Sequence, residues 1–227
     1  MNTTKSKAEF YYFLLASIFV ALLVSCNLIF QKFFSWNPFG LFKFEISVGL
    51  IPYPLTFLVT DLISEIYGKK RANQVVKVGL IASLVVMGVV IISSLVPATD
   101  WSPVNNESFN KVFGLTGVAV AASMLAYLFA QFIDIQVFHY LKVLTNGKHL
   151  WIRNNFSTIT SQFIDTVVVL GLLCSFQAIK WELFGTLLLS GFLFKVIVAL
   201  CDTPFFYLFT YLLKKKFNLN DCQVVQF

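Results

Sequence analysis

The chain has 227 residues, of which 58% are hydrophobic and only 12% are charged, and it carries a net charge of +6. A soluble domain is typically about 45–50% apolar and about 25% charged, because it needs polar side chains to cover its surface. The composition therefore excludes an ordinary soluble protein. It predicts one transmembrane domain over residues 1–227, with no room left for a soluble catalytic domain.

Apolar runs predict an all-α integral membrane protein with six transmembrane helices. Lys and Arg gather after the second, fourth and sixth runs, whereas the other connections contain few of them. By the positive-inside rule, both termini are expected in the cytoplasm. The four cysteines are widely separated and form no Cys/His cluster, so we expect no metal and no cofactor. The expected spans are residues 10–34, 44–67, 75–97, 115–144, 156–179 and 183–213.

The second span contains two prolines and two acids. Pro52 and Pro54 fall in its outer half, where proline removes backbone hydrogen bonds and breaks a helix. A broken helix at membrane depth usually lines a cavity. Asp61 and Glu65 follow four residues apart on one helix face. Asp61 is the stronger candidate for a buried site, because Glu65 could instead pair with Lys69 at the helix end.

The fourth and fifth spans contain the similar sequences AQFID and SQFID. Since these spans run in opposite directions, the two copies would face each other as in an inverted repeat, although a chance match is the alternative. Gln131 with Asp134, and Gln162 with Asp165, are each three residues apart and project from one helix face. Such pairs can bind the edge of a guanine-like base, or each Gln can simply orient its Asp or join two helices.

The sixth span contains Lys195 and Asp202 on one helix face, and Pro204, which should bend the helix. An ionisable side chain at a helix centre costs about 2.5–3.5 kcal/mol to insert, so these groups should face the bundle interior. Lys195 and Asp165 both approach the membrane midplane and could pair directly. The alternative to a functional site is a buried ion pair that only fixes the helix register.

Three stretches of the sequence resemble one known family. They are YPLTFLVTDLISEIYGKKRA at residues 53–72, the segment 155–166, and DTP at 202–204. These motifs resemble the queuosine precursor transporter family, also called the vitamin uptake transporter family, over nearly the whole chain. The resemblance implies import of 7-cyano-7-deazaguanine, 7-aminomethyl-7-deazaguanine or queuine across a bacterial inner membrane for tRNA modification. It also implies a fold similar to the substrate-binding components of energy-coupling factor transporters.

The combined hypothesis is a transporter that is not an enzyme, because no hydrolase or nucleotide-binding motif is present. Phe and Trp rings would stack on the base. The residues expected to hold its polar edge are Gln131, Asp134, Gln162 and Asp165. Those expected in a supporting polar network or in proton coupling are Asp61, Glu65, Lys195 and Asp202.

Other functions stay open at this point. A substrate-binding subunit of an ATP-driven vitamin importer would need small residues for docking, but Ala16 and Ala21 of the first span are five apart. A membrane scaffold or sensor would use the buried charges for packing alone. An intramembrane enzyme would need Asp61 and Glu65 to hold different pKa values. The expected partners are a small-molecule substrate and membrane lipid, without nucleic acid, and a homodimer is compatible with so small a bundle.

Overall fold

The computed structural model describes residues 3–30, 32–40, 43–113, 117–177, 180–220 and 223–225. Short 3₁₀ turns lie at Pro38–Gly40, Val48–Leu50 and Trp181–Leu183. The two strands are β1 (Phe33–Trp36) and β2 (Phe44–Ser47). The α-helices are α1 (Thr3–Ile29), α2 (Tyr53–Tyr67), α3 (Lys69–Leu95), α4 (Asn106–Phe113), α5 (Gly117–Leu144), α6 (Leu150–Ser175) and α7 (Phe184–Phe217).

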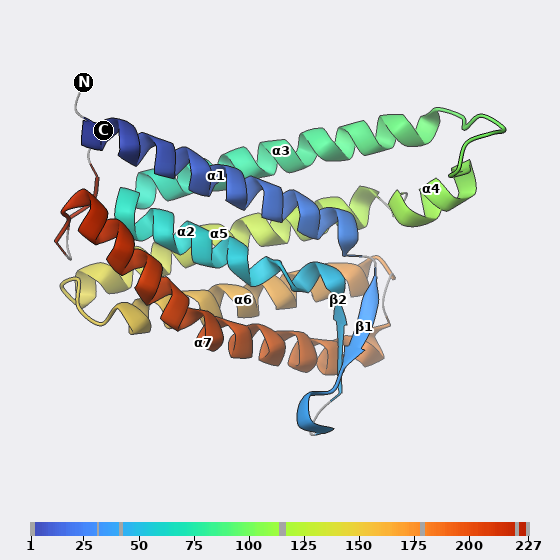
Figure 1. Cartoon of the computed structure of the whole chain (residues 1–227). Helices are drawn as coiled ribbons and strands as arrows, with labels where there is room; N and C mark the ends of the chain where they lie inside the picture. The colour runs from blue at the N-terminus through green and yellow to red at the C-terminus, as the bar shows by residue number, and fades with distance from the viewer. Residues whose placement is uncertain are drawn as a thin grey trace.

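Within the described residues, six helical segments are long and apolar enough to cross a membrane. They belong to α1, α2, α3, α5, α6 and α7, whereas the short polar helix α4 is not among them. The expectation of an all-α membrane protein with six spanning helices is therefore confirmed, and the chain is a multi-pass membrane protein. In Figure 1, α1 and α3 lie on one side of the bundle, α6 and α7 on the other, and α2 and α5 between them.

The two ends of the described chain lie at the same end of the bundle (Figure 1). Tyr11, near the start of α1, and Phe217, the last residue of α7, place their ring centroids 6.0 Å apart. Beyond α7, the backbone N–H of Val225 donates to the carbonyl of Ile66 at 2.8 Å. An even number of spans produces this arrangement.

The start of the second span differs from the expected helix over 44–67. Phe44–Ser47 forms strand β2, which pairs antiparallel with β1, and the α-helix begins only at Tyr53. The aromatic and β-branched residues of both strands favour this pairing, and Gly40, with φ of 70°, lies in the turn between them. The helix break expected from the prolines is present, because Pro52 precedes α2 and Pro54 lies in its first turn.

Other helix ends also move relative to the expected spans. The first span ends at Ile29 rather than residue 34, because the chain turns into the hairpin. Helix α6 begins at Leu150, six residues before expected, and α7 continues to Phe217 rather than ending at 213. Arg153 and Lys214, which fall outside the expected spans, therefore lie within α6 and α7. Helix α7 contains Pro204 and changes direction part-way along its length (Figure 1).

Helix α2 is the most buried of the six spans. In its most apolar window 72% of the residues are buried, against 22% for α1, α3 and α7. It contacts α1, α3, α5 and α7, so side chains on every face of α2 meet protein. The acids and hydroxyl residues of α2 are for this reason held inside the bundle, where they form the site.

Candidate functional site

A continuous polar face runs along α6. Its buried polar residues recur every three to four positions, so they lie on one side of the helix. In a membrane span such a face must contact protein rather than lipid. It meets α2, α5 and α7 and carries three separate polar clusters at successive depths. The residues of this face are Arg153, Asn154, Ser157, Thr158, Ser161, Gln162, Asp165 and Thr166.

The first cluster joins α6, α7 and the start of α2. Lys195 Nζ donates to Asp165 Oδ2 at 2.6 Å and to Thr166 Oγ1 at 3.0 Å, so the direct pair expected from the sequence is confirmed. The same ammonium lies 4.8 Å from the centroid of the Tyr53 ring. The Tyr53 hydroxyl lies near the carboxylate of Asp165, but the two groups do not form a regular hydrogen bond. Among the described residues, Tyr53 OH, Asp165 Oδ1 and Gln162 Oε1 are buried and have no hydrogen-bond partner.

Aromatic rings from the hairpin pack against Phe194, the residue before Lys195 in α7. The Phe194 ring, next to Lys195 in α7, lies 5.8 Å from the Trp36 ring and 6.4 Å from the Phe44 ring. At the exposed edge of β2, Lys43 hydrogen-bonds to Glu45 at 2.8 Å and lowers the pKa of that carboxyl. The hairpin therefore places apolar rings at the end of the bundle away from the two termini (Figure 1). Of the Trp rings, which the sequence analysis expects to stack on the base, Trp101 is 83% exposed in the loop after α3.

The second cluster contains three acids from three helices. Ser161 Oγ donates to Asp134 Oδ1 at 3.1 Å, and this bond joins the SQFID and AQFID sequences. Thr158 Oγ1 donates to Asp61 Oδ2 at 3.4 Å, and the carboxyl groups of Asp61 and Asp134 face each other. Asp202 of α7 lies near enough to interact electrostatically with both. Each of the three carboxyls keeps one buried oxygen without a partner among the described residues.

Gln131 lies apart from these acids and joins α5 to α2. Its amide Nε2 donates to the Tyr127 hydroxyl at 2.7 Å, and its Oε1 accepts from Thr60 at 3.1 Å. The Tyr127 hydroxyl in turn donates to Thr56 at 2.7 Å. Both polar atoms of Gln131 thus have protein partners, and the network fixes the Tyr127 ring 5.1 Å from that of Tyr53.

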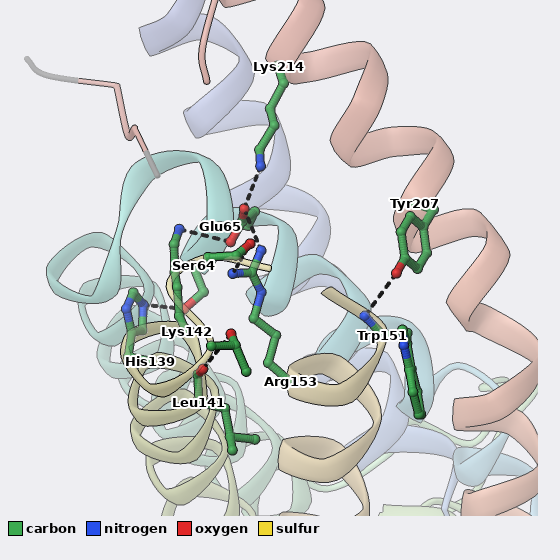
Figure 2. Close-up of polar contacts among 11 residues, drawn as sticks. Ser64, Glu65, His139, Leu141, Lys142, Trp151, Arg153, Tyr207 and Lys214 are labelled. Atoms are coloured by element: carbon green, nitrogen blue, oxygen red, sulfur yellow. Dashed lines mark hydrogen bonds and ion pairs between the residues drawn. The ribbon is translucent and has the colours of Figure 1, made fainter. Parts of the chain in front are cut away.

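The third cluster is centred on Glu65, which is fully buried (Figure 2). Its carboxylate accepts from Lys142 at 2.9 Å, from Arg153 at 2.9 Å and from Lys214 at 2.7 Å. These residues come from α5, α6 and α7, so one acid joins four helices. The alternative pairing with Lys69 is not seen, because α2 ends before that residue and Lys69 begins α3.

The sequence interpretation missed several members of these clusters. Tyr53 and Tyr127 were not considered, and Arg153 was assigned to a connecting loop although it is 1% exposed. The three- to four-residue spacing of Ser and Thr along α6 was the available signal for its polar face. Within the described residues, no group of three His, Cys, Asp or Glu side chains could hold a metal ion. Cys222 lies outside the described residues.

Comparison with known proteins identifies the family of the chain. Residues 47–209 match the family model described as "Putative vitamin uptake transporter". The chain belongs to this vitamin uptake transporter family. The matched region contains the first two clusters completely and Glu65 with two of its three basic partners.

Two curated relatives of the chain are named as transporters. A protein of Bacillus subtilis (strain 168), "Probable queuosine precursor transporter", is 28% identical over 174 residues, covering 74% of this chain and 72% of its own length. The "Queuosine precursor transporter" of Escherichia coli (strain K12) is 26% identical over 204 residues, covering 88% and 84%. No solved structure matches the chain, so the similarity to energy-coupling factor components stays a prediction.

Proposed function

We propose that this chain imports a queuosine precursor across a bacterial inner membrane to supply tRNA modification. The substrate is 7-cyano-7-deazaguanine, 7-aminomethyl-7-deazaguanine or queuine, and the chain acts without an enzymatic step. The names of the relatives support the substrate class. The observation that carries the proposal is the first cluster, where buried polar atoms of three side chains lack partners among the described residues.

The chemistry of this cluster suits the edge of a guanine-type base. Such an edge presents N–H donors beside a carbonyl acceptor. The open oxygen of Asp165 and the amide oxygen of Gln162 are acceptors for the N–H groups, whereas the Tyr53 hydroxyl and the Lys195 ammonium are donors for the carbonyl. A buried polar group without a partner costs about 1–3 kcal/mol, which a ligand that satisfies it recovers. The hairpin rings that pack against Phe194 provide the apolar faces for stacking.

The other predicted residues take supporting roles in this proposal. Asp134 offers its open carboxyl oxygen one helical turn from Asp165, across its bond to Ser161. Gln131 positions Tyr127 rather than the base. Asp61, Asp134 and Asp202 are neighbouring acids in a membrane interior, where such groups serve as proton relays. We assign proton coupling to these three acids.

The orientation follows from the distribution of basic residues. Glu65 and its partners lie at the bundle end where α2 meets α3 and where α5 meets α6. Both of these connections are rich in Lys and Arg, as is the end of α7. Cytoplasmic connections carry this excess, so we assign this end, and with it both termini, to the cytoplasm.

Direct binding tests the proposal. The purified protein in detergent is titrated calorimetrically with each of the three precursors and with guanine. We expect saturable binding of at least one precursor, and at least about tenfold weaker binding by Gln162→Leu and Asp165→Asn, because each loses a hydrogen bond to a buried ligand. Asp100→Asn, at an exposed loop position, is the matched control.

Two results would overturn the proposal. One is that no precursor binds to wild-type protein. The other is that both site variants bind as tightly as the control. Asp165→Asn leaves Lys195 without its acid and can therefore disturb folding. Gln162→Leu leaves the ion pair intact, so lost binding in this variant does not come from a broken ion pair.

A further inference from the structure

Polar side chains connect the first cluster with the Glu65 cluster. On α6, Asp165 of the first cluster lies twelve positions after Arg153. On α2, which runs in the opposite direction, Glu65 lies twelve positions after Tyr53. At about 1.5 Å per residue, the two clusters are about 18 Å apart along both helices. The second cluster and the polar face of α6 fill this interval, and such groups in a membrane interior mark the path of a substrate or an ion.

The Glu65 cluster closes this path at its inner end. The carboxylate of Glu65 is fully buried and bonds to basic side chains of α5, α6 and α7, which are Lys142, Arg153 and Lys214 (Figure 2). The same three helices and α2 contribute the polar groups of the second cluster. While the ion pairs are intact, the four helices meet at one side chain, and a bound substrate cannot pass between them.

An apolar layer lies against these ion pairs. The Phe138 ring of α5 has its centroid 5.5 Å from the guanidinium carbon of Arg153 and 6.3 Å from the centroid of the Phe206 ring of α7. Both rings are fully buried and pack with Leu58 and Leu62 of α2. Charged and apolar side chains of the same helices therefore close the path together.

Ion pairs suit a closure that must also open. The attraction within a buried ion pair is largely offset by the hydration that its two charges lose, so moving both charges into water costs little. Water is near, because Lys142 and Lys214 are 12% and 11% exposed. A cavity of about 490 Å³ adjoins the cluster, and its lining includes Arg153, Lys214 and the exposed Lys148. When the helices separate, hydration can replace the ion pairs.

The contacts of α7 indicate which helices separate. At the inner end of α7, the Phe217 ring lies 6.0 Å from that of Tyr11 and 6.4 Å from that of Tyr67, so α7 packs on α1 and α2. The cavity, in contrast, lies between α7 and the first turn of α6. Beside it, the backbone N–H of Trp151 donates to the Tyr207 hydroxyl at 3.0 Å. Helices α5 and α6 are therefore the pair with room to move relative to α7.

We propose that Glu65 and its three basic partners are the cytoplasmic gate of this transporter. Helices α5 and α6 separate from α2 and α7, the ion pairs exchange for hydration, and the substrate leaves along the polar face of α6. The structure described here has this gate closed. The inference rests on the proposed import and on the orientation assigned above.

A removable tether across the gate tests the proposal. Lys142→Cys and Lys214→Cys are combined, because both side chains reach the same carboxylate from α5 and α7, whereas Arg153 still pairs with Glu65. A short bis-methanethiosulfonate reagent joins the two thiols through disulfide bonds, and a reductant removes it. We expect the tethered protein to bind the precursor in detergent but to lose its uptake in proteoliposomes, and reduction should restore uptake.

The tether needs a background without reactive native thiols and a matched control. Cys201, which is exposed, and Cys222, which lies outside the described residues, are replaced by Ser throughout. The control is Glu107→Cys with Lys111→Cys, an exposed pair one turn apart on α4. Its tether should leave uptake unchanged.

A second experiment needs no substrate, so it distinguishes a failure of the gate from a failure of the proposed import. Ser157→Cys places a thiol one helical turn beyond Arg153 on the path, at a position that is 0% exposed. Lys142→Gln removes one ion pair of the gate, and we expect it to raise the labelling rate of this thiol by a maleimide about tenfold. Lys111→Gln should not change the rate. Ser83→Cys, equally buried but on α3, reports general loosening and should stay unreactive in both variants.

Three results would overturn the gate. One is uptake by the tethered protein at the rate of the reduced protein, and another is loss of precursor binding together with uptake. The third is a labelling rate of Ser157→Cys that Lys142→Gln raises no more than Lys111→Gln does, or no more than it raises that of Ser83→Cys.

Discussion

Glu65→Gln should strongly destabilise this protein. The substitution removes the carboxylate that compensates three basic side chains from three helices. Lys142 and Lys214 are 12% and 11% exposed and can move their long side chains toward water. Arg153 is 1% exposed and cannot. Leaving one buried partner of an ion pair uncompensated costs about 3–5 kcal/mol, against a typical net stability of about 5–15 kcal/mol.

The assay is chemical unfolding in detergent, followed by tryptophan fluorescence. The matched control is Glu107→Gln, whose partner Lys111 lies 2.6 Å away but whose own side chain is 74% exposed. An exposed pair contributes at most about 1 kcal/mol, so the control should lose little stability. If Glu65→Gln unfolds at the same denaturant concentration as Glu107→Gln, the description of Glu65 as the residue that joins four helices is wrong.

Three further predictions concern the polar and packing contacts. Tyr127→Phe removes the hydroxyl that joins α2 to α5, and it should lower the free energy of unfolding by about 1–3 kcal/mol in the same assay. Gly49→Ala should lower the free energy of unfolding by about 1–3 kcal/mol, because the new Cβ would lie 2.7 Å from a backbone oxygen of α1. Gly88→Ala, whose Cβ meets open space, is the control and should be neutral or slightly stabilising. Asp165→Asn and Lys195→Met should each lower the free energy of unfolding more than the double variant does, because the double variant leaves no unpaired buried charge. Additive losses of stability in this double-mutant cycle would show that the ion pair contributes nothing.

Much of the fold follows from the sequence because lipid imposes simple requirements. Apolar runs of sufficient length predict the six spans, and the two prolines of the second span predict its break. The expense of ionisable groups in lipid predicts that Asp61, Asp134 and Lys195 face protein, and all three are buried. Their positions along the helices also predict the pairing of Lys195 with Asp165.

The remainder depends on contacts that local patterns do not encode. The sequence does not show whether a basic residue at the end of a span marks the cytoplasmic side or forms an ion pair. The packing of four helices shows that Arg153 and Lys214 bond to Glu65. Gln131 has the same spacing to its acid as Gln162, yet it bonds to tyrosine and threonine because its side chain meets α2. The hairpin was missed because its strands are as apolar as the helix expected there.

The most direct test of the central claim is uptake by the purified protein in sealed proteoliposomes. Labelled 7-cyano-7-deazaguanine, 7-aminomethyl-7-deazaguanine and queuine would be supplied outside, with Asp165→Asn and Asp100→Asn in parallel vesicles. The account predicts that at least one precursor accumulates through wild-type protein and Asp100→Asn, but not through Asp165→Asn. If none of the three enters faster than into empty vesicles, or if Asp165→Asn transports as fast as wild type, the account is contradicted.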